Sequence, residues 1–198
     1  MPTTHVLYLH GFRSSPQSAK ARLMAQHMAA LHPGVVWHCP QLPPSPRDAM
    51  DLVSQATASW PSESMAVVGS SLGGFYATWV AEQRGCRAVL LNPAVNPARD
   101  LEQYIGEQTQ FHAPEESFFF KEEYVQQLRD LTCGALRQPK NYFCIVAKGD
   151  EVLDWRETQA HYAAARMLLL EGGDHAISDF AEIGRRRVGK ECRSRWSP

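Results

Sequence analysis

The feature that most constrains the fold is a G-x-S-x-G motif at residues 69–73, which follows an apolar run at residues 65–68 and precedes a helix-like segment. A strand that passes through a tight turn into a helix needs small residues around the turn, and Gly69 and Gly73 supply that room. Such a turn presents its central serine, so the spacing predicts Ser71 as an exposed nucleophile. Ser70 is interpreted as a small residue that fills the turn.

The later part of the chain offers a base and an acid for this serine. A serine hydroxyl is a weak nucleophile at neutral pH and needs a histidine that a carboxylate orients. Two apolar runs, Tyr142–Ala147 and Met167–Leu170, lead into loops that contain Asp150 and His175. Open parallel sheets place their sites just past the carboxyl ends of strands. We therefore predict Asp150 as the orienting acid and His175 as the general base.

Other acidic residues and histidines are alternatives for the roles of Asp150 and His175. Asp154 is the main alternative acid, because it lies one helical turn beyond Asp150, but its place before Trp155 is typical of a helix N-cap. Glu151 is expected to point elsewhere, and Asp174 precedes His175 too closely to clamp its ring. His10 is expected to orient a loop. The remaining histidines have no motif context: His5, His27, His32, His38, His112 and His161.

An oxyanion hole needs two backbone N–H groups aimed at the developing negative charge. The first apolar run, Val6–Leu9, ends at His10-Gly11-Phe12. We predict that the amides of Phe12 and Leu72 form the hole, because Gly11 allows a close approach of the backbone and Leu72 follows the nucleophile. The ring of Phe12 can also wall the pocket.

Apolar and helical patterns alternate along the chain. We expect strands at Val6–Leu9, Val35–Cys39, Met65–Gly69, Ala88–Leu91, Tyr142–Ala147 and Met167–Leu170. We expect helices at Ser18–Leu31, Pro46–Ser59, Gly74–Arg84 and Trp155–Ala164, with another beginning near Ile177. This alternation predicts an α/β protein with a mostly parallel six-stranded sheet and helices on both faces. A chain of 198 residues that is 44% hydrophobic can bury one core, so residues 1–198 are expected to form a single domain.

The segment from about 97 to 139 interrupts the alternation. It contains helical patterns near Leu101–Ile105 and Glu122–Leu131 and the aromatic run Phe118-Phe119-Phe120. Long insertions in compact domains are usually functional or mobile. We expect a short helical cap whose three phenylalanines line a substrate pocket. The alternative is a pair of surface helices that use these rings to pack on the body.

As a set, these motifs resemble the α/β-hydrolase superfamily, and more narrowly the small bacterial esterases of the YqiA-like family. The resemblance covers Val6 to about Phe180 and is carried by residues 7–12, 39–44, 69–76, 92–95, 149–154 and 171–175. It implies a three-layer α/β-hydrolase fold with the strand order 2-1-3-4-5-6, and an esterase or thioesterase with Ser71, Asp150 and His175 as its triad. It does not specify a substrate. The basic ending after Ile183 departs from the compact apolar helix expected there.

Composition excludes several other classes. A formal net charge of −1 provides no general attraction to nucleic acid or anionic membranes, and the basic residues after 184 are interpreted as a solvated terminus. We expect no partner of either kind. No zinc spacing, dinucleotide fingerprint or P-loop is present, so no metal or cofactor is expected. Five scattered cysteines, without a signal peptide or membrane span, favour a reducing cytoplasm.

Two functions remain. The first is a serine hydrolase that cleaves carboxylic esters or thioesters through an acyl-enzyme on Ser71. The expected aromatic lining favours short to medium apolar acyl groups over peptides. The second is a non-catalytic ligand-binding or scaffold protein that keeps the fold without turnover. The complete set of Ser71, Asp150 and His175 favours the first.

Overall fold

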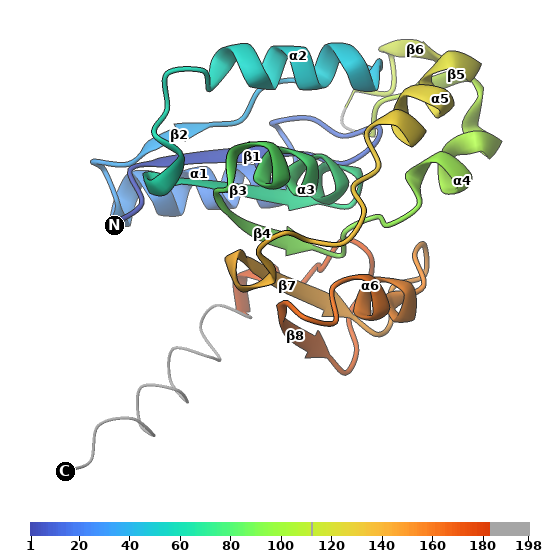
Figure 1. Ribbon diagram of the computed structural model, residues 1–198. Coiled ribbons are helices and arrows are strands. Elements are labelled where there is room, and N and C mark those ends of the chain that lie inside the picture. Colours follow the sequence, from blue (N-terminus) through green and yellow to red (C-terminus); the bar gives the residue numbers. More distant parts are fainter. Residues whose placement is uncertain (112, 183–198) are drawn as a thin grey trace.

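The computed structural model describes residues 1–111 and 113–182, and six parallel strands form its central sheet (Figure 1). These strands are β1 (His5–Leu9), β2 (Val36–His38), β3 (Met65–Ser70), β4 (Arg87–Leu91), β7 (Tyr142–Ala147) and β8 (Arg166–Leu170). The helices are α1 (Ala19–Leu31), α2 (Pro46–Ala56), α3 (Leu72–Arg84), α4 (Pro97–Leu101), α5 (Glu122–Asp130) and α6 (Trp155–His161). Short 3₁₀ turns cover Ser62–Ser64, Glu102–Tyr104 and Pro139–Asn141.

The strand order β2-β1-β3-β4-β7-β8 confirms the predicted order 2-1-3-4-5-6. Every neighbouring pair in this sheet is parallel, and the registers bring strand ends together, with Leu9 beside Gly69, Ser70 beside Leu91, and Ala147 beside Leu170. Because parallel strands point the same way, their carboxyl ends share one edge of the sheet. The loops after β1, β3, β4, β7 and β8 therefore meet there.

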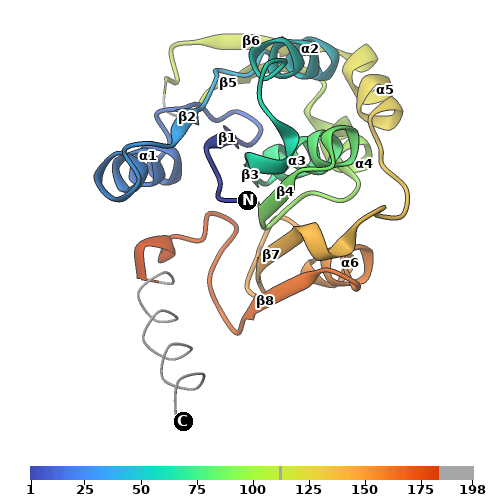
Figure 2. The same ribbon diagram turned by 60° about the vertical axis from the view of Figure 1, so that its left-hand side comes forward.

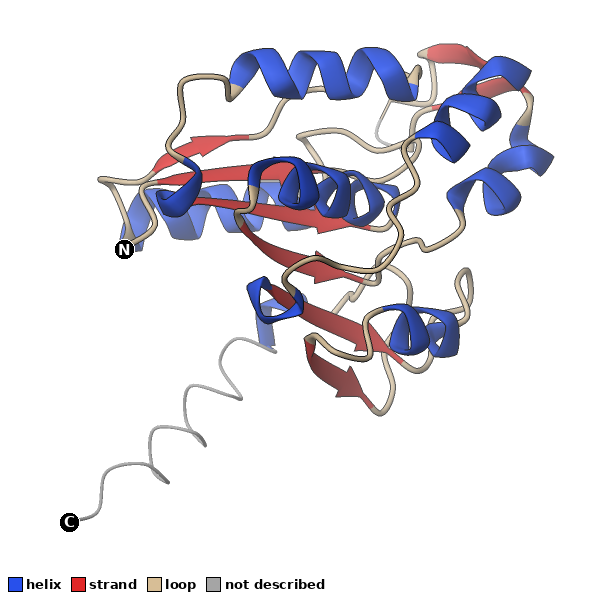
Figure 3. Cartoon of the chain, in the orientation of Figure 1, coloured by secondary structure: helices blue, strands red, loops and turns tan. Residues whose placement is uncertain are grey.

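Helices cover both faces of the sheet, as predicted, and α3 lies in front of the strands in Figure 3 while α1 lies behind them. Side chains alternate between the faces along each strand. Leu7, Leu9 and Val67 join the buried cluster beneath α2 and α3, whereas Tyr8 and Val68 pack on the opposite face with Ala21 of α1. This alternation produces two apolar layers on one sheet.

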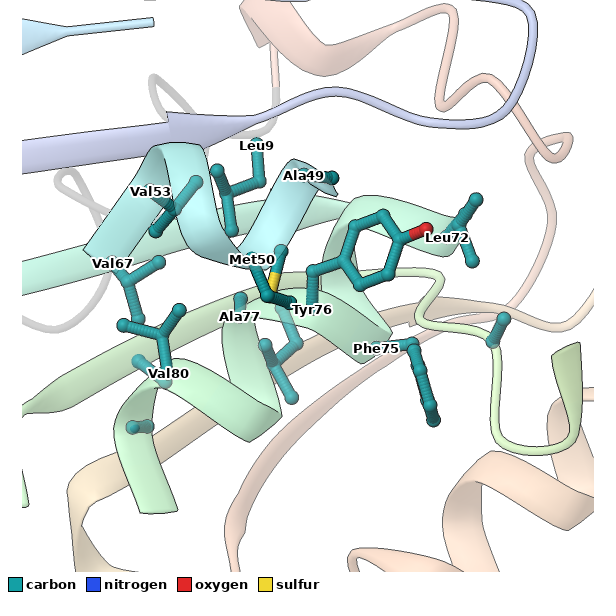
Figure 4. Packing of buried hydrophobic residues seen from close by; sticks show 14 of the residues in the cluster. Leu9, Ala49, Met50, Val53, Val67, Leu72, Phe75, Tyr76, Ala77 and Val80 are labelled. Carbon is teal, nitrogen blue, oxygen red and sulfur yellow. The ribbon is translucent and has the colours of Figure 1, made fainter. Parts of the chain in front are cut away.

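The larger layer contains the helix that follows the G-x-S-x-G motif. Figure 4 shows Leu72, Tyr76 and Val80 of α3 in one packed group with Met50 and Val53 of α2 and with side chains of the sheet. Helix α3 is buried on most of its surface, because it lies between the sheet and α2. Its position is therefore held by packing from several sides.

Helices α1 and α2 begin within one residue of their predicted starts, Ser18 and Pro46. The Ser18 hydroxyl caps α1 by accepting the Ala21 amide, and Ser45 caps α2, whose first residue is Pro46. These contacts satisfy amides that have no partner within the first turn of a helix. Helices α2 and α6 both end three residues before the predicted ends, at Ala56 and His161.

The insertion between β4 and β7 differs from the prediction of a purely helical cap. Helices α4 and α5 are present, but between them lies an antiparallel hairpin of β5 (Gly106–Thr109) and β6 (Ser117–Phe120). The β6 residues are aromatic and suit a strand, whereas β5 is polar and carries no alternation that could reveal its partner. In Figure 2 this hairpin lies with α5 beside α2, at the opposite end of the molecule from β8.

Several features of the sequence fall at or beyond the limits of the described residues. The basic residues after 184 lie outside them, as do His112 and Cys192. The four cysteines within the described part, Cys39, Cys86, Cys133 and Cys144, are free thiols. No helix among the described residues is long and apolar enough to cross a membrane.

Leu90 provides a test of the packing. Its side chain is fully buried in the larger layer, whereas Leu31, at the end of α1, is 67% exposed. We expect Leu90→Ala to lower the free energy of unfolding by about 2–5 kcal/mol, because it leaves a cavity. Leu31→Ala is the matched control and should change it by no more than about 0.5 kcal/mol. Urea titration of both variants measures the difference, and equal losses would contradict this description of the core.

Candidate active site

Ser71 occupies the turn between β3 and α3 in a conformation that L-residues rarely adopt, with φ 56° and ψ −122°. Surrounding contacts hold this strained backbone, since the Ser71 amide donates to the Leu91 carbonyl at 3.0 Å and the Ser71 carbonyl accepts the Ala94 amide at 3.1 Å. A Cβ at Gly73 would overlap the carbonyl oxygen of Leu9. The turn thus packs directly on the end of β1.

His175 and Asp150 lie beside Ser71. Nε2 of His175 is 2.9 Å from the Ser71 hydroxyl, and Nδ1 is 2.8 Å from Oδ2 of Asp150. The Asp150 side chain is only 2% exposed, and its Oδ1 also accepts the amides of Val152 and Leu153. These bonds fix the carboxylate against the ring. The three side chains form one continuous chain of contacts that ends at the serine hydroxyl.

Asp154 lies away from this chain of contacts. Its carboxylate caps α6, as its sequence position predicts, by accepting the Arg156 amide at 3.0 Å. That hydrogen bond lowers the pKa of Asp154. Asp174 is likewise occupied elsewhere, because it accepts bonds from the amide and the hydroxyl of Ser178. Asp150 is therefore the carboxylate that contacts the His175 ring.

The loop that carries His175 is anchored by Asn92, a buried residue at the end of β4. The Asn92 amide group donates to the carbonyls of Asp174 and His175, each at 3.1 Å, and its Oδ1 accepts the Ala147 amide at 2.8 Å. Asn92 is 2% exposed and has φ 41°, a region that asparagine tolerates better than most residues. One side chain thus joins the ends of β4 and β7 to the histidine loop.

Two charged side chains contribute further anchors to this loop. Oε2 of Glu151 accepts the His175 amide at 2.9 Å, and the Lys20 ammonium donates to the Ala176 carbonyl. Glu151 does point away from the ring, as expected, but it holds the backbone of the histidine. None of these anchoring roles was predicted for Asn92, Glu151 or Lys20. Asn92 and Glu151 carried a signal, since both belong to motifs of the family resemblance, whereas Lys20 carried none.

The loop after β1 passes close to the serine. A Cβ built on Gly11 would lie 3.2 Å from the Ser71 Cβ and 3.7 Å from its Oγ, so a side chain there would crowd the hydroxyl. Phe12 follows directly. On the other side, Leu72 is the first residue of α3, and its amide belongs to the first turn, which has no intrahelical carbonyl partners. Phe12 and Leu72 therefore follow two residues that lie against each other, Gly11 and Ser71, and their amides remain the prediction for the oxyanion hole.

His10 ties this loop to the body. Its Nδ1 lies 3.0 Å from the Gly11 carbonyl, and its Nε2 accepts the Leu42 amide at 3.0 Å. Since a carbonyl only accepts, Nδ1 carries the proton and the ring is neutral. Burial lowers the pKa of His10, which favours the same state. His10 therefore orients the loop, as the sequence predicts.

The insertion supports the same loop from the other side. The Phe12 ring packs against Tyr104, Phe118 and Phe120, with ring centroids 5.6, 6.0 and 5.2 Å away. The Arg13 guanidinium donates to the carbonyl and the hydroxyl of Thr109, at 2.7 and 3.1 Å. The hairpin is thus fastened to the loop by apolar and polar contacts together.

The three phenylalanines of β6 have different surroundings. Phe118 lines a cavity, and Phe120 is buried against Phe12 and Tyr124. Phe119 points to the other side of the strand and is 60% exposed. Neither Phe119 nor Phe120 lines a cavity at the site, so the prediction that these two residues line the pocket is wrong. The period-2 alternation of a strand explains this difference, and it was missed because the segment was not predicted as a strand.

Two cavities adjoin the loop and share His10, Gly11, Phe12 and Ser14. The smaller, of about 250 Å³, is lined among others by Leu42, Pro43, Pro44, Leu72, Tyr76 and Phe118. The larger, of about 410 Å³, is lined among others by Lys20, Leu23, Ser71, His175, Ile177 and Phe180. Among the described residues, no three His, Cys, Asp or Glu side chains gather as a metal site would require.

Comparisons with solved structures identify the fold as that of α/β-hydrolases. A putative hydrolase from Agrobacterium vitis superposes with a TM-score of 0.71 at 18% identity, covering 96% of this chain and 89% of that one. Alpha/beta hydrolase domain-containing protein 10 from mouse gives 0.70 at 14% identity, covering 93% and 86%. Est1E from Butyrivibrio proteoclasticus gives 0.66 at 15% identity, covering 94% and 86%.

The sequence also matches one family over residues 5–187. The chain belongs to the uncharacterised protein family UPF0227. This match confirms the YqiA-like resemblance drawn from the motifs.

Substitution of Asn92 tests whether this side chain anchors the loop that carries His175. Asn92→Ala removes the partner of the buried Ala147 amide and of two carbonyls, and leaving one buried polar group unpaired costs about 1–3 kcal/mol. We expect the free energy of unfolding to fall by at least that amount, and the Ala147 amide to exchange with deuterium faster. The matched control is Asn96→Ala, at an exposed position. Equal stability of the two variants would contradict the anchoring role of Asn92.

Proposed function

We propose that this protein is a serine hydrolase that cleaves carboxylic esters or thioesters with short to medium apolar acyl groups. The observation that supports this most strongly is the chain of contacts from Asp150 through His175 to the Ser71 hydroxyl, at 2.8 and 2.9 Å. It stands beside two amides suited to an oxyanion hole. A fold alone would not support a reaction, because one fold hosts many functions.

In the proposed mechanism, Ser71 attacks the carbonyl carbon while Nε2 of His175 takes the hydroxyl proton. Asp150 holds the ring and stabilises the imidazolium that forms. The amides of Phe12 and Leu72 donate to the oxyanion. His175 then gives the proton to the leaving oxygen or sulfur as the acyl-enzyme forms. A water molecule then attacks the acyl carbon while His175 takes its proton. The proton passes to the Ser71 oxygen as its bond to the acyl group breaks, and the carboxylic acid is released.

The smaller cavity supports an apolar acyl preference. Its lining includes two prolines, Leu42, Leu72 and Phe118. Each buried methylene adds about 0.8 kcal/mol of favourable transfer free energy, so longer acyl chains bind better until the space is filled. A volume of about 250 Å³ limits that length. A thioester fits the same scheme, since the chemistry at Ser71 is unchanged.

The names of several structural neighbours agree with this proposal. Est1E is one, and an esterase domain from a Rhodothermus marinus protein and an esterase from Pyrococcus furiosus are others. Their identities to this chain are 15%, 18% and 18%, so they support the fold, and the proposed activity rests on the contacts of Ser71, His175 and Asp150.

Covalent labelling is the most direct test. A fluorophosphonate reacts with an activated serine, and we expect it to modify Ser71 in a peptide identified by mass spectrometry. Ser71→Ala should abolish labelling and lower the rate of ester hydrolysis by a factor on the order of 10⁶. Ser70→Ala is the matched control and should keep both. A wild-type protein that is folded but neither labelled nor active would instead favour a non-catalytic binding protein.

A pair of aspartate variants tests the assignment of the acid. Asp150→Asn keeps the shape of the side chain but removes the charge that holds the imidazolium, and in a Ser-His-Asp triad this lowers kcat by about 10⁴. We expect that loss with little change in KM. Asp154→Asn makes the same chemical change at the cap of α6 and should leave kcat nearly unchanged. If Asp154→Asn is the inactive variant instead, the assignment is reversed.

A further inference from the structure

Two cavities adjoin the loop that carries Gly11 and Phe12, and the proposed catalytic residues line only one of them. Ser71 and His175 line only the larger one, whereas Leu72 and Phe118 line only the smaller one. An ester bound at Ser71 has two parts to accommodate, its acyl chain and its leaving group. The lining residues therefore indicate which part each cavity takes.

The path of the proton indicates on which side of Ser71 the leaving group lies. When the bond from the carbonyl carbon to the leaving oxygen breaks, that oxygen takes from His175 the proton that came from Ser71. The leaving group must therefore lie on the side of the histidine, in the larger cavity. The acyl chain then occupies the smaller cavity, whose one charged lining residue among those described, Arg13, has its guanidinium bonded to Thr109. This assignment rests on the proposed hydrolase function.

We propose that the leaving group carries an anion, a carboxylate or a phosphate, and that Lys20 is the residue that selects it. Among the described residues that line the larger cavity, Lys20 is the only lysine or arginine, and no aspartate or glutamate lines it. Leu23, Ile177 and Phe180 provide apolar walls. The leaving group thus combines an apolar body with a negative end.

The Lys20 ammonium has N–H groups available for a ligand. It holds the Ala176 carbonyl with one N–H, and within residues 1–111 and 113–182 it makes no second hydrogen bond. An ammonium has three N–H groups, so two remain for a ligand. Burial lowers the pKa of Lys20, which reflects a positive charge that is incompletely solvated. An anion bound in the cavity would compensate that charge.

The nearby carboxylates do not take the place of a substrate anion. Asp174 and Asp150 act on Lys20 through space, but neither forms an ion pair with it within the described part of the chain. The Asp174 carboxylate is bonded to Ser178, and that of Asp150 to His175. Ser18, in the same cavity, uses its oxygen to accept the Ala21 amide, so its O–H proton can go to a ligand.

The test compares esters that share one acyl group. Butyryl esters of 4-hydroxybenzoate and of 4-hydroxyphenyl phosphate are anionic, and the butyryl ester of methyl 4-hydroxybenzoate is neutral. We measure the ratio of kcat/KM for each anionic ester to that for the neutral one, in the wild type and in three variants. Lys20→Met removes the charge, Lys20→Arg keeps it, and Lys140→Met makes the same change at an exposed lysine.

We expect Lys20→Met to lower the ratio for at least one anionic ester by about ten- to a hundred-fold, the size of a hydrogen bond to a charged group. Lys20→Arg and Lys140→Met should keep the ratio. The ester whose ratio falls further identifies the preferred anion. Equal losses of activity on anionic and neutral esters in Lys20→Met would show that Lys20 acts only by holding Ala176, and would overturn the proposal.

A measurement on the wild type keeps the proposal testable if Lys20→Met does not fold. The free leaving groups are products, and either 4-hydroxybenzoate or 4-hydroxyphenyl phosphate should inhibit more strongly than methyl 4-hydroxybenzoate. Stronger inhibition by the neutral product would overturn the proposal. A wild type that hydrolyses all three esters without preference refutes the role of Lys20 alone, whereas one that hydrolyses none and resists fluorophosphonate refutes the hydrolase function as well.

Discussion

The site depends on one close contact, that between the turn at Gly73 and the carboxyl end of β1. Because Gly73 has no side chain, the turn can press against the Leu9 carbonyl, and the residues after Leu9 reach the Ser71 side chain. Any side chain at Gly73 would push the two segments apart. This backbone contact brings Ser71 and the loop after β1 together, and the hydrogen bonds of Ser71 to Leu91 and Ala94 then hold the turn.

Around this contact, the parts of the site are held by different elements. Asn92 ties the histidine loop to the ends of β4 and β7, and His10 ties the Gly11–Phe12 loop to Leu42. Both anchors are buried side chains that bond to backbone groups, so they fix the path of the chain while Ser71, His175 and Asp150 contact one another. Under the proposed function, the residues that hold the backbone are thus different from those that react.

Much of this arrangement could be predicted from the sequence, because it is encoded locally. The alternation of strands and helices follows from short patterns, the strand order was implied by the family resemblance, and Asp154 could be set aside as a helix cap from its position alone. The hairpin at residues 106–120 could not be predicted, since polar β5 becomes a strand only by pairing with β6. The anchors Asn92 and Lys20 were missed for a similar reason, because their partners lie more than 50 residues away in the chain.

The fastening of the hairpin to the loop after β1 has an evolutionary consequence. Phe12 packs on three rings of the insertion, and Arg13 bonds to Thr109 in β5. Under the proposed mechanism, the segment that shapes the acyl cavity also supports an amide that stabilises the transition state. Drift in the insertion therefore cannot alter substrate range without disturbing turnover, and a relative that acquires a new specificity here must carry paired changes in both segments.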